Sequence, residues 1–134
     1  MARRLGEAAS AYHLERTGHA PKGATVMLGK DTLVVTLQGA LSPAERALAS
    51  KPAGAAKVQD FHRQLFATSS EKIREKILEI TGVRVNEAAA EVETASGTVV
   101  HTFTSGTMVQ VYLLAEPLPE SSWSGAPDPK GTPT

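Results

Sequence analysis

The chain has 134 residues, with 14 basic and 14 acidic side chains and therefore no formal net charge. This length predicts a single domain, and the charge balance gives no general electrostatic case for nucleic-acid binding. The absence of cysteine excludes disulfides, thiolate metal sites and a cysteine nucleophile, and it fits a reducing cytoplasm. No apolar run approaches the roughly 18 residues of a membrane span, so we expect a soluble protein that does not insert into the membrane.

The first expected element is an amphipathic helix over residues 2–17. Its apolar side chains recur at helical spacing on one face, and they are Leu5, Ala8, Ala9 and Tyr12. Gly18 is a natural helix stop, and Pro21 prevents the helix from continuing.

Two apolar runs follow, at about residues 24–28 and 32–38, and Gly29-Lys30-Asp31 separates them. A glycine followed by polar residues between two such runs is typical of a β-hairpin. We therefore predict two antiparallel strands at this position.

The second run leads through Gly39 into a helix start. Ser42 is suited to the N-cap position, Pro43 to the first helical position, and Glu45 to the position that completes a capping box. The sequence predicts a short helix over residues 44–50, which Lys51-Pro52-Ala53-Gly54 interrupts.

A longer helix is predicted from about residue 55 to 81, and Gly82 follows it as a left-handed C-cap. Apolar residues keep helical phase along it, and they are Val58, Phe61, Leu65, Ile73, Ile77 and Ile80. Thr68-Ser69-Ser70-Glu71 could instead cap a new helix. We favour one continuous helix because the apolar stripe stays in phase.

Residues 83–93, 98–103 and 107–114 are predicted to be extended, the last two because they are rich in β-branched and aromatic residues. The segregated order of helices and strands predicts an α+β fold. We expect an antiparallel sheet of four to five strands, covered on one face by the long helix, within a single domain over residues 1–116. The proline-rich residues 117–134 are expected to form a flexible tail.

The histidines have no convincing metal-ligand spacing, and they are His13, His19, His62 and His101. We expect them to be incidental surface or edge residues, with no metal and no cofactor bound. Ser69 and Ser70 stand near His62, but no nucleophile elbow surrounds them, and a capping role explains them better. We therefore expect no enzymatic activity, and a hydrolase using His62 or His101 is the least favoured alternative.

A small-anion site is a second hypothesis. Residues 18–23 could offer backbone amides and Lys22 to an anion beside Ser42 at a helix N-terminus. Bicarbonate or a nucleotide would be the ligand of such a sensor domain, although a purely structural loop is the default interpretation.

Protein contacts are the favoured basis of function. The strand at 107–114 has apolar residues on both faces, and we interpret it as a sheet edge. The face that carries Val109, Val111 and Leu113 would then need a second element to bury it. The long helix would cover one face and a second copy the other, which predicts a homodimer. Trp123 in the tail could anchor a docking segment.

Four segments in chain order resemble one known family. They are Gly18–Lys22, Asp31–Val35, Gly39–Glu45 with Leu48, and Glu79–Val85. Together they resemble the MpsC-type domain, a bacterial family named after the soluble component of a sodium-translocating, membrane-potential-generating system. The chain has Ser42 where members tend to have threonine, which preserves the cap, and Ala20 where they tend to have a second glycine.

The resemblance implies a cytoplasmic accessory protein, linked with membrane components for ion or inorganic-carbon uptake. A membrane transporter subunit is the partner it implies. It carries over no catalytic residue.

Overall fold

The computed structural model describes residues 1–93 and 106–118. Their elements in chain order are α1 (Ala2–Thr17), β1 (Gly23–Gly29), β2 (Thr32–Gln38), α2 (Pro43–Leu48), α3 (Pro52–Ser69), α4 (Glu71–Thr81), β3 (Val85–Glu93) and β4 (Thr107–Leu114). The predicted α+β class and the antiparallel sheet are confirmed. The strand predicted at 98–103 and most of the predicted tail lie outside the described residues.

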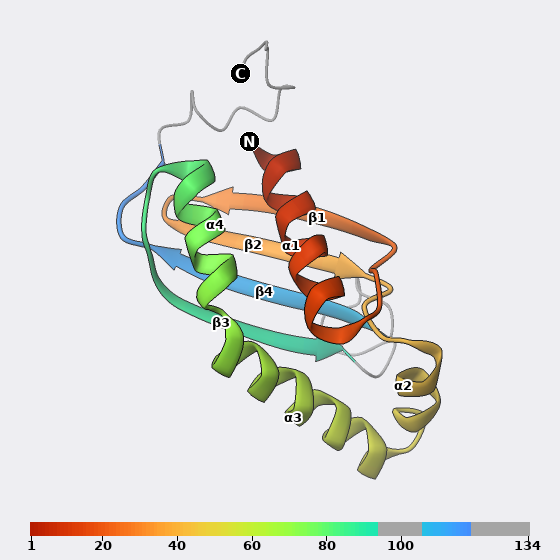
Figure 1. The fold of residues 1–134 in the computed structure, drawn as a ribbon. Helices are drawn as coiled ribbons and strands as arrows, with labels where there is room; N and C mark the ends of the chain where they lie inside the picture. The colour runs from red at the N-terminus through yellow and green to blue at the C-terminus, as the bar shows by residue number, and fades with distance from the viewer. Residues whose placement is uncertain (94–105, 119–134) are drawn as a thin grey trace.

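The four strands form one antiparallel sheet in the order β1-β2-β4-β3. Figure 1 shows α1 and α4 lying over one face of this sheet, with α3 running beside β3. The cover that we expected from one long helix is therefore shared by three helices. The hairpin of β1 and β2 forms as predicted, with Lys30 and Asp31 as its turn and a φ of 58° at Lys30.

The prediction that residues 107–114 form a sheet edge is wrong. β4 pairs with β2 on one side and with β3 on the other, so it is a central strand. The order arises because the β1–β2 hairpin adds to β4 through β2, which leaves β1 and β3 as the two edges. The local sequence could not reveal this, since a central strand and an edge strand with two apolar faces look alike.

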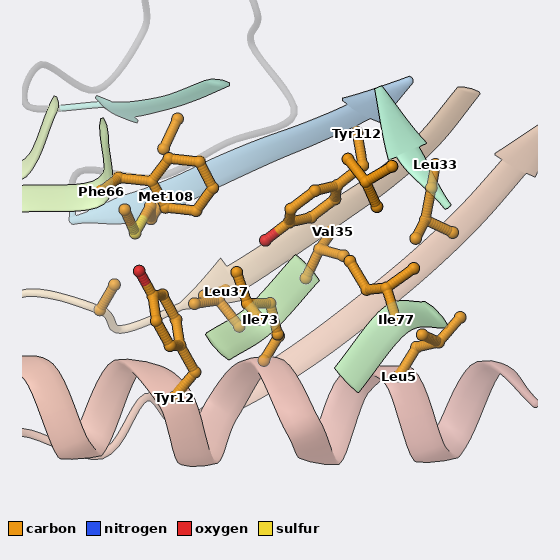
Figure 2. Packing of buried hydrophobic residues seen from close by; sticks show 14 of the residues in the cluster. Leu5, Tyr12, Leu33, Val35, Leu37, Phe66, Ile73, Ile77, Met108 and Tyr112 are labelled. Carbon is orange, nitrogen blue, oxygen red and sulfur yellow. The ribbon is translucent and has the colours of Figure 1, made fainter. Parts of the chain in front are cut away.

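The core lies between the sheet and the helices. Alternate residues of β2 and β4 point into it, among them Leu33, Leu37 and Tyr112, each with none of its surface exposed. Figure 2 shows these side chains meeting Leu5 and Tyr12 of α1, Ile73 and Ile77 of α4 and Phe66 of α3. Leu118 also belongs to this buried cluster, although it lies two residues beyond the expected domain boundary.

The single helix predicted over residues 55–81 is wrong, because it is interrupted at Ser70. Two hydroxyl groups at the break donate to backbone carbonyls one turn earlier, Thr68 Oγ1 to Gln64 O at 2.9 Å and Ser69 Oγ to Leu65 O. Such back-bonding bends helices. The expected cap is also absent, since Ser70 makes no side-chain capping bond.

Gly54 allows α2 and α3 to approach each other closely. A Cβ atom built on Gly54 would lie 1.9 Å from the carbonyl oxygen of Leu48, a distance that no real contact tolerates. The backbone of α3 therefore passes directly against the end of α2, and only glycine fits there.

We predict that Gly54→Ala lowers the free energy of unfolding by about 1–3 kcal/mol, because α2 must shift to admit the methyl group. Helix propensity alone predicts the opposite sign, a gain of about 0.5–1 kcal/mol. Urea unfolding followed by circular dichroism decides between them. Ala56→Gly at an exposed position of α3 is the control for propensity, and a stabilised Gly54→Ala variant would refute the close approach.

Candidate functional site

The junction between β2 and α2 is the most heavily bonded polar region among the described residues. Ser42 is the N-cap of α2, with φ −68° and ψ 163°, and Pro43 is the first helical residue. Ser42 Oγ accepts from the Glu45 amide at 3.2 Å, while the Ser42 amide donates to Glu45 Oε1 at 3.0 Å. The predicted capping box is therefore confirmed.

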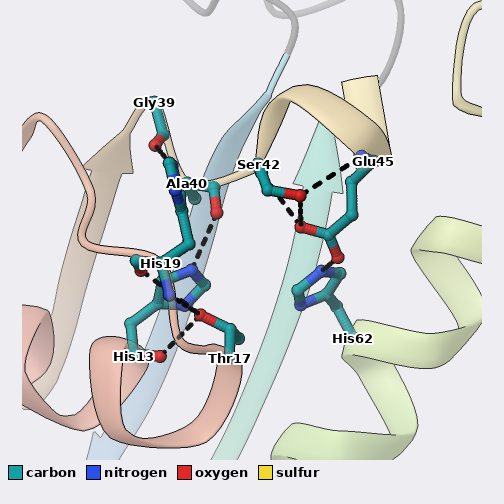
Figure 3. Close-up of polar contacts among 8 residues, drawn as sticks. All are labelled: His13, Thr17, His19, Gly39, Ala40, Ser42, Glu45 and His62. Atoms are coloured by element: carbon teal, nitrogen blue, oxygen red, sulfur yellow. Dashed lines mark hydrogen bonds and ion pairs between the residues drawn. The ribbon is translucent and has the colours of Figure 1, made fainter. Parts of the chain in front are cut away.

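The Glu45 carboxylate also reaches outside its own helix. Its second oxygen, Oε2, accepts from His62 Nε2 at 2.7 Å, and the His62 side chain is 1% exposed. Partial burial acts to raise the pKa of Glu45, but the hydrogen bonds from Ser42 and His62 outweigh it and hold that pKa below its usual value. One carboxylate thus fixes the start of α2 and ties α2 to α3 (Figure 3).

Two further histidines hold the backbone that leads into α2. His13 Nε2 donates to Ala40 O at 2.8 Å, and His19 Nε2 donates to Gly39 O at 3.1 Å. A carbonyl oxygen can only accept, so each Nε2 carries a hydrogen. Figure 3 shows the three imidazoles gathered around this junction from α1, the following loop and α3.

His13 and His62 lie against each other. Their ring centroids are 6.0 Å apart, and the ring planes differ by 15°. Burial lowers the pKa of His13, and the neighbouring His62 lowers it further, although the bond to Ala40 acts in the opposite direction. The expectation of incidental surface histidines is therefore wrong for these two, which are 3% and 1% exposed.

The geometry does not form a nucleophile-activating arrangement. The carboxylate of Glu45 stands between the Ser42 hydroxyl and the His62 imidazole, whereas a serine nucleophile needs the imidazole in the middle. Across residues 1–93 and 106–118, no three histidine or carboxylate side chains lie close enough together to hold a metal ion. The described part of the chain also contains no helix with the length and apolar character needed to cross a bilayer.

Most of the chain, including this junction, matches one known protein family. A model of the family described as "Na+-translocating membrane potential-generating system (MpsC)" matches residues 1–106. The chain belongs to the MpsC family. No curated protein and no solved structure matches it. The match spans α1 through β3 and includes the whole β2–α2 junction, so the segment that most resembled the family is the one held by the capping box and the histidines.

Of the two residues of the anion hypothesis, Lys22 lies against Gly39 in this MpsC-family fold, and Ser42 follows that glycine by three residues along the chain. Gly39 has a φ of 62°, and a Cβ atom built on it would lie 2.7 Å from Lys22 Cγ, so the Lys22 stem rests on this glycine. The Ser42 amide and hydroxyl both donate to Glu45. The two donors that Ser42 would offer to an anion are thus already engaged by a carboxylate. Anion binding stays an untested prediction.

The predicted interaction residues fall into two groups. Val109, Val111 and Leu113 share the face of β4 that points away from the helices; the two valines are half-buried and Leu113 is 38% exposed. Trp123 lies outside the described residues.

The residues of this junction whose burial and bonding the sequence analysis missed are His13 and His62. A signal for both was present, because each occupies the buried stripe of its helix. His13 lies four residues after Ala9, and His62 lies midway between Val58 and Phe66. Their partners were not visible, since Ala40 and Glu45 are 27 and 17 residues away along the chain.

We predict that Glu45→Ala destabilises the protein more than Ser42→Ala does. Loss of the serine cap costs about 1 kcal/mol. Loss of Glu45 also leaves the buried Nε2–H of His62 without a partner, which raises the cost to about 2–3 kcal/mol. Chemical unfolding at neutral pH measures both. Glu75→Ala, at an exposed position of α4, is the control and should change stability by less than about 0.5 kcal/mol; equal costs for the two cap variants would contradict the role of His62.

We also predict that stability falls on acidification partly through His13. The folded protein binds a proton at His13 less readily than the unfolded chain, so the free energy of unfolding decreases as the pH drops below about 6.5. Glu45 adds its own loss at lower pH, below about 4.5, because its pKa is also lowered. The variant His13→Gln keeps a donor for Ala40 O, and its free energy of unfolding should decrease less steeply between about pH 7 and about pH 5. At neutral pH this variant should be less stable than the wild type by about 1–2 kcal/mol. Urea midpoints across this range provide the test, and an unchanged pH profile would contradict it.

Proposed function

We propose that this protein is a non-enzymatic cytoplasmic accessory or regulatory protein of a membrane ion-uptake system, and that it acts through protein contacts. Family membership supports the association with a sodium-translocating, membrane-potential-generating system. We further propose that it self-associates as a homodimer and contacts a membrane subunit of that system.

The observation that carries the proposal is the outer face of the sheet, which points away from the helices. Its apolar part includes residues that pair across three strands: Met27 with Val34, and Val34 with Val111. Met27 of the edge strand β1 is 64% exposed and Leu113 of the central strand β4 is 38% exposed, so apolar side chains on this face reach solvent. Contiguous apolar surface of this kind is typical of a protein contact site.

Capture from solubilised membranes tests this proposal. The bait is the full chain, and the double variant Met27→Glu/Leu113→Glu places charge on the outer face. Leu78→Glu is the matched control, because Leu78 is an exposed leucine (44%) on α4. We expect the wild type and Leu78→Glu to recover an integral membrane protein of ion transport, identified by mass spectrometry, and the double variant to recover at least about tenfold less.

Two outcomes would contradict the proposal. Recovery of no membrane transport protein by the wild type would remove the accessory role. Equal recovery by the double variant would move the contact away from the outer face. A chain that ends after Leu118 keeps the buried core and tests the tail with Trp123 separately.

A further inference from the structure

The two edges of the sheet differ in how they are protected. β3 has Glu87 and Glu91 at exposed positions and a register irregularity between Val85 and Glu87. α3 lies along it, where Gln59 Nε2 donates to Val92 O at 3.2 Å and Arg63 pairs with Glu91 at 3.0 Å. Charges, a bulge and a covering helix are the features by which proteins block the addition of another strand.

β1 has none of these features. Its sequence, Gly-Ala-Thr-Val-Met-Leu-Gly, contains no charge and no proline, and it pairs with β2 without a register shift from Gly23 to Gly29. Residues 1–93 and 106–118 place no strand on its other side. Because a two-residue turn follows Gly29, antiparallel pairing directs the backbone groups of Gly29, Met27 and Thr25 toward β2. The amides and carbonyls of Ala24, Val26 and Leu28 therefore face outward.

A groove runs between this open edge and α1. It has a volume of about 640 Å³ and is lined by Arg3, Gly6, Glu7 and Ser10 of α1 and by Ala24 and Val26 of β1. Its floor is made of small groups, since a Cβ atom built on Gly6 would lie 3.5 Å from the Ala24 methyl. Arg3 and Glu7 are exposed, and neither pairs with another described residue.

We propose that a second copy of this chain docks here, through antiparallel pairing of β1 with β1 about a two-fold axis at Val26. This inference rests on the self-association in the proposed function and names its surface. Such pairing places Ala24 opposite Leu28, and Thr25 opposite Met27, so each pair shares one face of the sheet. The outward amides of Ala24, Val26 and Leu28 find carbonyl partners in the second copy.

Charge complementarity identifies the second copy as the occupant. The axis at Val26 passes close to Gly6, which contacts that strand. Arg3 and Glu7 lie on either side of Gly6 on the same face of α1, and the two α1 helices run antiparallel across the axis. Arg3 of each copy therefore faces Glu7 of the other, and the same pair forms twice, as an isologous interface requires. The result is a continuous sheet through both copies, with both outer faces on one side.

A charge-swap experiment tests the interface. Sedimentation of the full chain between about 1 and about 500 µM should show a monomer–dimer equilibrium. Arg3→Glu and Glu7→Arg should each weaken the dimer about tenfold or more, because each places like charges together twice. The double variant, and an equimolar mixture of the two single variants, should restore association. Lys57→Glu, on α3 away from the groove, is the control and should leave the dissociation constant unchanged.

Amide hydrogen exchange tests the strand pairing itself. The amides of Ala24, Val26 and Leu28 should exchange more slowly as the concentration of the chain increases, and Val26→Pro, which removes the central donor, should abolish the dimer.

Four outcomes would overturn the inference. They are a monomer at all concentrations, a dimer insensitive to the charge variants, a dimer without protection of the Val26 amide, and protection of that amide only after a membrane partner is added. Capture of a membrane protein by a monomeric wild type would leave the accessory role standing and remove only this interface.

Discussion

The position of α2 depends on one carboxylate. α2 has no buried residue of its own, so apolar packing does not hold it in place. Glu45 instead uses one oxygen to complete the capping box with Ser42 and the other to accept from the buried His62 of α3. A carboxylate shared in this way joins a local interaction to a tertiary one. The path of the chain from β2 through α2 follows from this arrangement, whereas the placement of α3 beside β3 also rests on its own buried residues and on its bonds to β3.

The histidines extend the same constraint to α1. His13 of α1 and His19 of the following loop donate to the consecutive carbonyls of Ala40 and Gly39, the two residues after β2. On the other side of the junction, His62 of α3 holds Glu45. Backbone carbonyls in a buried junction must find donors, and side chains provide them where no strand or helix continues. The segment that most resembles the MpsC family therefore has a clear structural role, which explains its residue types without a bound ligand. The contact surfaces that we propose lie elsewhere, on the outer face of the sheet and at β1.

Only those contacts of the candidate site that join residues close together in the sequence could be predicted. The capping box lies within four residues, and the types Ser42, Pro43 and Glu45 suffice to identify it. His62 and His13 occupy the buried stripes of their helices, which signals burial but not function, because the same positions suit an apolar residue. Their partners lie on other elements, and hydrogen bonds between elements distant in the chain leave no spacing in the sequence.

By itself the sequence determined the helix ends at Gly18 and Gly82, the β1–β2 hairpin, the start of α2 and the α+β class, because each depends on backbone preferences and side-chain bonds within a few residues. Only the tertiary structure decided the strand order that makes β4 central, the break at Ser70 and the burial of the two stacked histidines. Strand order is set by which surfaces pack together most favourably across the whole chain, and an apolar run has the same pattern at an edge as at the centre. The helix stripe likewise stays in phase through Ser70, while hydroxyl back-bonding and the packing of α3 and α4 against different elements bend the backbone.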